Sequence, residues 1–231
     1  MRLHQVVSGT GLPLVFVHGL GTSATAWDVV RPLLDDEFTV IALDLLGHGE
    51  SPVPDDPSEY TRDRMLAEFD ELLDGLPQRP VMIGHSLGGY LTLAYAATRP
   101  GRLAGIVVEN TGPGFRDSEK REGWNERSRR NAHRFGVPVQ VTEMNLQHDS
   151  VVMDRLPEMD VPTLVLAGGD DRPEYQGSGT YLERKMPDAR MVVIPGGGHN
   201  MHEEDQASLV ADAIRDFVPG PWSGGMSRPP G

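Results

Sequence analysis

Residues 80–90 read PVMIGHSLGGY, a short apolar run that leads into a serine flanked by glycines, and a stretch with helical spacing follows up to Thr98. This order predicts a strand, a sharp turn and a helix, with Ser86 at the turn. In such a turn the serine adopts a strained backbone conformation that lifts its hydroxyl clear of the sheet edge. The pattern predicts a nucleophile. A glycine-rich turn with an incidental serine is the alternative.

The two glycines that flank the serine have a steric explanation. Side chains at Gly84 and Gly88 would collide where the strand and the helix pack closely. The new helix also directs its N-terminal amides at the place where negative charge would develop during acyl transfer. The same turn therefore predicts an oxyanion site beside Ser86.

Composition bounds the kind of protein. The chain has 231 residues, of which 38% are hydrophobic and 24% charged, as is usual for one water-soluble domain. No run of about 18 apolar residues occurs, so no membrane span is expected. The first residues lack the apolar core of a secretory signal, and there are no cysteines, so we expect a cytoplasmic protein without disulfides. The net charge of -13 disfavours nucleic acid as a partner.

Apolar patterning predicts alternating strands and helices. Expected strands cover 3–7, 14–17, 38–43, 81–83, 103–108, 161–167 and 190–194, and expected helices cover 60–73, 87–98, 179–186 and 203–217. Such alternation is typical of the α/β class, with a mostly parallel sheet covered by helices on both faces.

Two stretches interrupt this alternation. Residues 112–159 are charged and too long for a plain loop, so we expect an inserted helical lid. Residues 219–231 are rich in glycine, proline and serine and are expected to form a flexible tail. The α/β core would then comprise 1–111 and 160–218.

A nucleophilic serine needs a general base. His199 follows three glycines and the last expected strand, so it should lie at the same sheet edge as Ser86. His202 is the rival, but it stands at the start of the closing helix beside two glutamates and could brace the loop instead.

The base in turn needs a carboxylate to orient it. The strand that ends near Gly168 is followed by Asp170 and Asp171, and one of them should hold the imidazole of His199. Glu109, at the end of another strand, is a third candidate.

The oxyanion needs amide donors. The amide of Leu87, directly after the nucleophile, would be one, and the amide of Leu20, in a glycine-bearing loop after a strand, would be the other. His18, in the same loop, is expected to have a structural hydrogen-bonding role.

Taken together, these motifs resemble the α/β-hydrolase superfamily. The matching segments are HG at 18–19, DLLGHGES at 44–51, GHSLGG at 84–89, GGDD at 168–171 and GHNMHE at 198–203, in the order that the superfamily shows. The resemblance covers about residues 3–218 and implies that Asp171 is the triad acid and His199 the base. The superfamily's usual first strand is missing, which implies a sheet of about seven strands.

The resemblance also bounds the chemistry. Dehalogenases and epoxide hydrolases of this fold carry aspartate at the nucleophile position, so Ser86 implies acyl transfer to water from a small carboxylic ester, thioester or lactone. The sequence gives no sign of a metal cluster or a dinucleotide loop, so neither a metal nor another cofactor is expected. The expected partner is a small-molecule acyl substrate, and the oligomeric state is left open.

Basic residues are concentrated in 112–159. The seven lysines and arginines within 116–134 could form a rim for an anionic substrate, with Arg116 as one contact and Arg127 in the same group, or could simply be a solvated helix face. Trp124 and Phe135 are eleven residues apart and would share a helix face, as the roof of the acyl pocket or as contacts to the core.

Residues 112–116, GPGFR, resemble the lid of the menaquinone-pathway synthases, which eliminate pyruvate from a carboxylated intermediate. Those enzymes usually have tyrosine and arginine where this chain has His85 and Tyr90. A carbon–carbon hydrolase or lyase on an anionic substrate is therefore the second interpretation. A non-catalytic ligand receptor is the third, since a fold and its motifs do not determine function.

Overall fold

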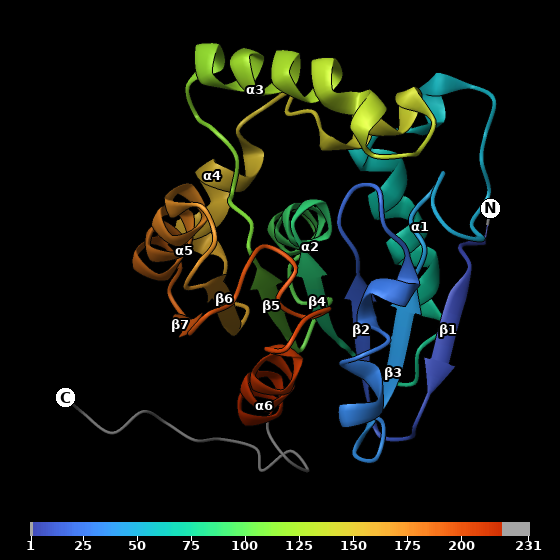
Figure 1. The fold of residues 1–231 in the computed structure, drawn as a ribbon, viewed down its shortest axis with the longest axis vertical. Helices are drawn as coiled ribbons and strands as arrows, with labels where there is room; N and C mark the ends of the chain where they lie inside the picture. The colour runs from blue at the N-terminus through green and yellow to red at the C-terminus, as the bar shows by residue number, and fades with distance from the viewer. Residues whose placement is uncertain (1, 219–231) are drawn as a thin grey trace.

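The computed structural model describes residues 2–218, so the expected tail at 219–231 lies outside the described residues. Seven strands form one sheet, in the order β1-β3-β2-β4-β5-β6-β7 (Figure 1). Only β1 runs antiparallel to its neighbour; all other pairs are parallel. The strands are β1 Gln5–Ser8, β2 Leu12–Val17, β3 Phe38–Leu43, β4 Val81–His85, β5 Gly105–Glu109, β6 Thr163–Gly168 and β7 Ala189–Ile194. The predicted fold class and strand number are confirmed.

Helices cover both faces of the sheet. The α-helices are α1 Arg62–Asp74, α2 Leu87–Thr98, α3 Ser118–Asn131, α4 Val151–Arg155, α5 Pro173–Lys185 and α6 Ala207–Phe217. Short 3-10 helices are η1 Ala24–Trp27, η2 Arg31–Leu33, η3 Pro57–Glu59, η4 Ala132–Arg134, η5 Val139–Asn145 and η6 Leu156–Glu158. Within residues 2–218, each helix is too short or too polar to cross a bilayer.

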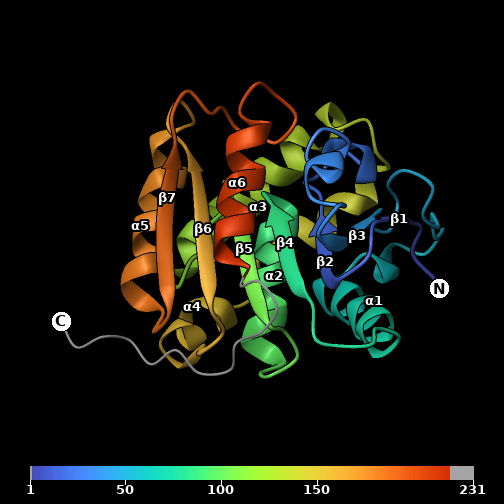
Figure 2. The same cartoon turned by 90° about the horizontal axis from the view of Figure 1, so that it is seen from below.

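Alternation along β2 divides the core into two layers. Val15 and Val17 pack with α1 and α2, whereas Leu14 and Phe16 pack with η1 and α6 on the opposite face. In Figure 2, α6 accordingly lies in front of the strands, with α1 and α2 behind them. This is the expected result of a strand buried on both faces, whose side chains point alternately to each layer.

The segment 112–159 lies between β5 and β6. It forms α3, α4 and three of the 3-10 helices, and Figure 1 shows α3 crossing above the carboxyl ends of the strands. Two helix starts differ from the sequence prediction. α5 begins at Pro173, which suits the first helical position, and α6 begins only at Ala207, after turns that carry the chain back to the sheet.

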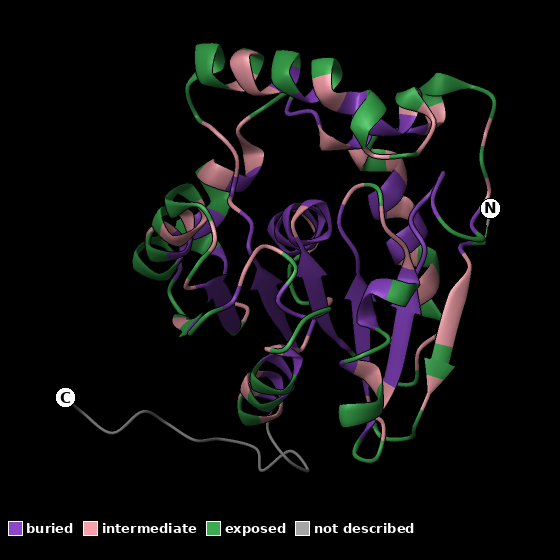
Figure 3. Ribbon diagram, viewed as in Figure 1, coloured by how far each residue is buried: buried purple, intermediate pink, exposed green. Residues whose placement is uncertain are grey.

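Backbone contact between α2 and the sheet controls the geometry around Ser86. Every residue of α2 from Leu87 to Ala97 is buried (Figure 3). A Cβ added at Gly84 would lie 2.3 Å from the carbonyl oxygen of Gly88, and one at Gly88 would lie 2.1 Å from that of Val17. These two glycines are therefore required by packing, as the sequence predicted.

Two helical glycines should respond oppositely to the same substitution. Gly88→Ala forces the backbones of α2 and β2 apart, so we expect a loss of several kcal/mol in the free energy of unfolding, on the order of 3. Gly177→Ala in α5 meets no atom within 4 Å, so it should stabilise the protein by about 0.5–1 kcal/mol through helix propensity. Urea unfolding of both variants measures this, and equal effects would contradict the packing argument.

Candidate active site

Ser86 stands between β4 and α2 in a conformation that few residues adopt. Its φ is +51°, one of two positive values among the non-glycine residues that the structure describes. The backbone is fixed on both sides, because the amide of Ser86 donates to the Glu109 carbonyl at 2.9 Å and its own carbonyl accepts from the Thr111 hydroxyl at 2.7 Å. The strained turn predicted from the glycine pattern is therefore present.

His199 lies between Ser86 and Asp171. Its Nε2 is 3.3 Å from the Ser86 Oγ, and its Nδ1 is 2.7 Å from a carboxylate oxygen of Asp171. Since a carboxylate only accepts, Nδ1 carries the proton and Nε2 is free to accept from the serine hydroxyl. The Asp171 side chain is only 4% exposed, against 32% for His199. The three residues that the sequence placed at separate strand ends thus meet in one chain of hydrogen bonds.

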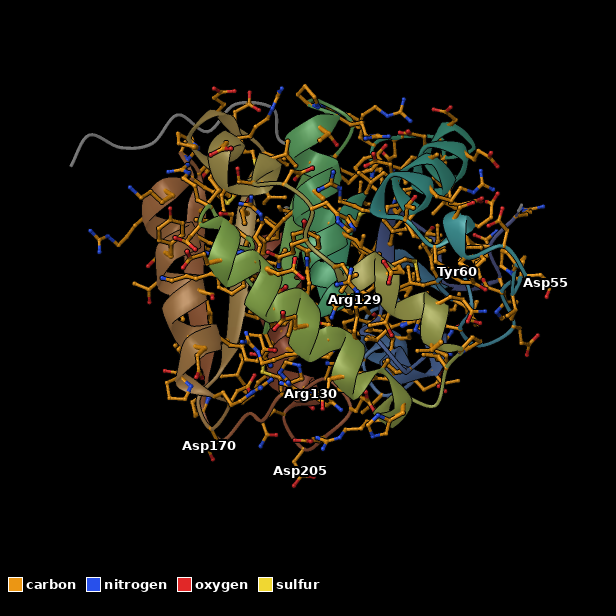
Figure 4. The ribbon with its side chains drawn as sticks, turned by 90° about the horizontal axis from the view of Figure 1, so that it is seen from above. Asp55, Tyr60, Arg129, Arg130, Asp170 and Asp205 are labelled. Atoms are coloured by element: carbon orange, nitrogen blue, oxygen red, sulfur yellow. The ribbon has the colours of Figure 1, made fainter. Side chains whose placement is uncertain are left out.

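The other two candidate acids lie elsewhere. Asp170 is exposed at the rim of this face, where Figure 4 shows its side chain directed outward. Glu109 is fully buried and accepts a hydrogen bond from His202 Nδ1 at 2.7 Å. The geometry therefore favours Asp171, and Glu109 and His202 form a separate pair.

That pair is a buried ion pair beneath the His199 loop. Neither side chain is exposed, and the His202 ring stacks on Trp27 with centroids 4.3 Å apart. Burial lowers the pKa of His202, but the carboxylates of Glu109 and Glu203 outweigh it and raise the pKa to about 9. His202 is thus a charged brace that ties the loop to β5.

Two further side chains hold the carbonyl of His199. His85 Nε2 lies 2.9 Å from that oxygen and must donate to it, while Asn110 Nδ2 donates to it at 2.8 Å and to the Gly198 carbonyl at 3.0 Å. Burial holds the pKa of His85 well below its usual value, so its ring is neutral. Asn110 was not foreseen, because no pattern in the sequence identifies a side chain that supports a distant loop.

His85, Glu109 and His202 also form the only group of three potential metal ligands found within residues 2–218. A protonated imidazole has no lone pair for a metal, and Glu109 already balances the charge of His202. The ion pair accounts for this cluster without a metal.

The candidate oxyanion donors flank Ser86. Leu20 and Leu87 border adjoining cavities that meet at the serine. Among residues 2–218, neither backbone amide donates to a carbonyl or a side chain outside the regular elements. Leu87 is the first residue of α2, and the first amides of a helix have no partner within it. Both amides are thus without an acceptor among these residues, as an oxyanion donor must be.

The loop that carries Leu20 is held by two histidines. His18 Nδ1 donates to the Gly19 carbonyl at 2.7 Å, and its Nε2 accepts from the Leu45 amide at 3.0 Å. Burial is the main reason why the pKa of His18 falls to about 3, so the ring stays neutral. His48 Nε2 accepts from the Gly21 amide at 3.1 Å. The expected structural role of His18 agrees with these contacts.

Two cavities open above Ser86. One has a volume of about 370 Å³ and is lined by Leu87, Tyr90, Phe115 and Gln147 among others. The second, of about 510 Å³, contains Leu20, His199 and Phe135. Trp124 lines both, so the two predicted aromatic contacts border the site. They do not share one helix, since α3 ends at Asn131.

Arg116 does not border either cavity. Its guanidinium donates to Asp154 at 2.8 Å and to the Met153 carbonyl at 3.1 Å, at an exposed position. Arg127 and Arg172 line both cavities instead. Sequence reasoning included Arg127 in the basic group but overlooked Arg172, although it directly follows Asp171.

The charged brace predicts a pH effect on stability. His202 has a pKa of about 9 in the folded chain and about 6.5 when unfolded, so its contribution is complete below pH 6.5 and disappears as pH rises through 9. A rise of this size corresponds to roughly 3 kcal/mol. We expect the Tm of the wild type to fall more between pH 6 and pH 9.5 than that of Glu109→Gln/His202→Gln, which lacks both charges.

The single variant His202→Gln is the matched comparison. It leaves Glu109 buried without a counter-charge and should be less stable at pH 6 than the double variant. Parallel Tm curves for the wild type and the double variant would show that this pair is not the titrating group.

The chain is similar to several known enzymes. The chain is 30% identical to a thermophilic esterase from Thermogutta terrifontis, solved with malate bound; the match covers 94% of this chain and 92% of that one, with a TM-score of 0.77. It is 25% identical over 248 residues to a putative 2-succinyl-6-hydroxy-2,4-cyclohexadiene-1-carboxylate synthase of Bacillus subtilis (strain 168), which covers 89% of both chains.

An enol-lactonase from Burkholderia xenovorans LB400 shares the fold, with a TM-score of 0.77 at 21% identity over 94% of this chain and 96% of the other. The model of the alpha/beta hydrolase family matches residues 14–213. That range contains Ser86, Asp171 and His199 together with all strands except β1 and the first residues of β2, and the protein therefore belongs to the alpha/beta hydrolase family.

Proposed function

We propose that the protein is a serine-dependent hydrolase that cleaves a small carboxylic ester, thioester or lactone through an acyl-enzyme intermediate. The hydrogen-bonded chain from Ser86 through His199 to Asp171 carries this proposal. Two unpartnered amides and two cavities at the same serine give it the other parts of an acyl-transfer site.

In the first half-reaction, Ser86 Oγ forms a bond to the substrate carbonyl carbon while its proton passes to His199 Nε2. The amides of Leu20 and Leu87 stabilise the oxyanion, and Asp171 stabilises the imidazolium. The tetrahedral intermediate then collapses. The bond to the leaving oxygen or sulfur breaks, and that atom takes the proton from His199.

Water completes the cycle. His199 takes a proton from a water molecule, whose oxygen attacks the acyl carbon. The acyl–serine bond breaks, and the proton returns to Ser86. Because His199 lines the 510 Å³ cavity, the leaving group would occupy that side and the acyl group the 370 Å³ cavity. A cavity of that size suits a small acyl group beneath Trp124 and Phe115.

The segment 112–159 would serve as the cover of the site. Trp124 Nε1 donates to the Asn145 carbonyl at 3.0 Å, and Asn125 and Gln147 exchange two hydrogen bonds of 2.9 Å. These contacts fix α3 to the end of η5 and to the chain that follows it. The cover would therefore present a preformed roof that excludes bulk water.

A lyase or carbon–carbon hydrolase acting on an anion is the second candidate. The similarity to the Bacillus subtilis synthase over 89% of both chains favours it. Two residues beside the nucleophile argue against it. His85 donates to the His199 carbonyl, and the hydroxyl of Tyr90 lies 3.5 Å from Arg62 Nη1. These positions lack the tyrosine and arginine typical of the synthases.

Loss of the nucleophile tests the hydrolase. Ser86→Ala should reduce hydrolysis of p-nitrophenyl acetate by at least about a thousandfold, while its Tm stays within a few degrees of the wild type. A fluorophosphonate probe should label the wild type and not the variant. Undiminished turnover by the variant would refute the assignment. A wild type that neither turns over nor labels would favour a ligand receptor.

A further inference from the structure

The two cavities share a wall that crosses above Ser86. Besides the serine, this wall consists of Trp124, Arg127, Asn145, Arg172 and Tyr175. Two of the five are arginines, and they come from different parts of the chain. Arg127 belongs to α3 in the cover, and Arg172 precedes α5 in the core.

Arg172 is held in place by its surroundings without a carboxylate partner for its guanidinium. Its Nη2 donates to the Tyr175 hydroxyl at 3.0 Å, and the guanidinium lies 5.0 Å from the centre of the same ring. The Tyr175 ring packs in turn against His199, with centroids 4.7 Å apart. The positive charge is thereby placed close to the reacting groups.

The guanidinium of Arg127 has no hydrogen bond or ion pair with any residue in 2–218. The same is true of Arg130 and Arg134, but these two line neither cavity, whereas other arginines of the segment are paired. Arg116 pairs with Asp154, Arg129 with Glu122 and Glu143, and Arg121 donates to two carbonyls. Arg127 and Arg172 thus place two positive charges without carboxylate partners at one site, in a chain with a net charge of -13. Glu174 lines the 370 Å³ cavity but forms no ion pair with either arginine among the described residues.

We propose that Arg127 and Arg172 bind a carboxylate of the substrate, close to the scissile carbonyl. The substrate would then be an anionic ester, a monoester of a short dicarboxylic acid. The inference rests on the proposed hydrolase function and adds its specificity. Guanidinium groups bind carboxylates through paired, charged hydrogen bonds, and both arginines are exposed and so accessible to a substrate.

The proposal also covers the length of the acyl group. Both arginines line the same two cavities as Ser86, so a short link between the carboxylate and the reacting carbonyl belongs to the proposal. In an ester with a long acyl chain, the carboxylate would lie beyond Arg127 and Arg172 and could not bind to them. The anion would also bridge α3 and the Arg172 loop, so that substrate binding holds the cover against the core.

Two ethyl esters of matched shape test the proposal. Ethyl hydrogen succinate carries the carboxylate, and in ethyl levulinate a methyl ketone replaces it. We expect the wild type to prefer the succinate ester in kcat/KM. Arg127→Gln and Arg172→Gln should each lower that preference at least tenfold, and the double variant should lower it further. High ionic strength should lower it as well.

Arg130→Gln is the matched control. Arg130 is exposed on α3 and lines neither cavity, and Figure 4 shows it on the outer side of the helix, so the variant removes the same charge and should keep the preference. The ratio of kcat/KM for the succinate ester to that for the levulinate ester is the measured quantity. If it falls equally in Arg127→Gln, Arg172→Gln and Arg130→Gln, the specific site is refuted and the preference is a general charge effect.

The outcomes separate the inference from the function on which it rests. Ser86-dependent hydrolysis of both esters with no preference for the succinate ester would keep the hydrolase and refute the carboxylate site. If neither ester is hydrolysed, the hydrolase assignment loses support. The carboxylate site is then tested separately by the binding of succinate. Succinate should raise the Tm of the wild type but not of the Arg127→Gln/Arg172→Gln variant, and no rise in the wild type would overturn the proposal.

Discussion

The site depends first on the close backbone contact between α2 and the sheet. Only glycine at positions 84 and 88 lets the carbonyls of Gly88 and Val17 approach so closely. This contact forces the chain through a positive φ at Ser86, and the same turn exposes the amide of Leu87 at the start of α2. The proposed nucleophile and one proposed oxyanion donor therefore depend on a single packing constraint.

The proposed mechanism also requires a fixed position for His199 as the base, and contacts to its backbone and its loop provide it. His85 and Asn110 hold the His199 carbonyl, and the ion pair of His202 with Glu109 anchors the chain three residues later. Removing one partner of a buried ion pair is costly, so the pair keeps the loop in one arrangement. The ring nitrogens of His199 are therefore free to contact Asp171 and Ser86.

This division explains how much could be predicted from the sequence. Strands, glycine turns and residues at strand ends follow local rules, so the parallel sheet, Ser86 and His199 were predictable. The choice of Asp171 needed the family resemblance, and the structure supplies the reason, since Asp170 points into solvent. Contacts within 112–159 depend on how α3 docks through Asn125 and Gln147, which no local pattern encodes. For this reason the sequence indicates Arg116 as a substrate contact, whereas in the structure Arg127 and Arg172 line the cavities.

In the proposed function, the segment 112–159 and the core contribute differently to chemistry and specificity. Every group proposed to handle a proton or the oxyanion lies on the core, next to strand ends fixed by the sheet. The shared wall above Ser86 instead combines Trp124 and Arg127 from α3 with Arg172 and Tyr175 from the core. A change in α3 can therefore alter which acyl group fits without disturbing the His199 hydrogen bonds. Tyr175 does not follow this separation, because it contacts both Arg172, a proposed substrate-binding residue, and His199, the proposed base. A change at Tyr175 should therefore affect specificity and chemistry together.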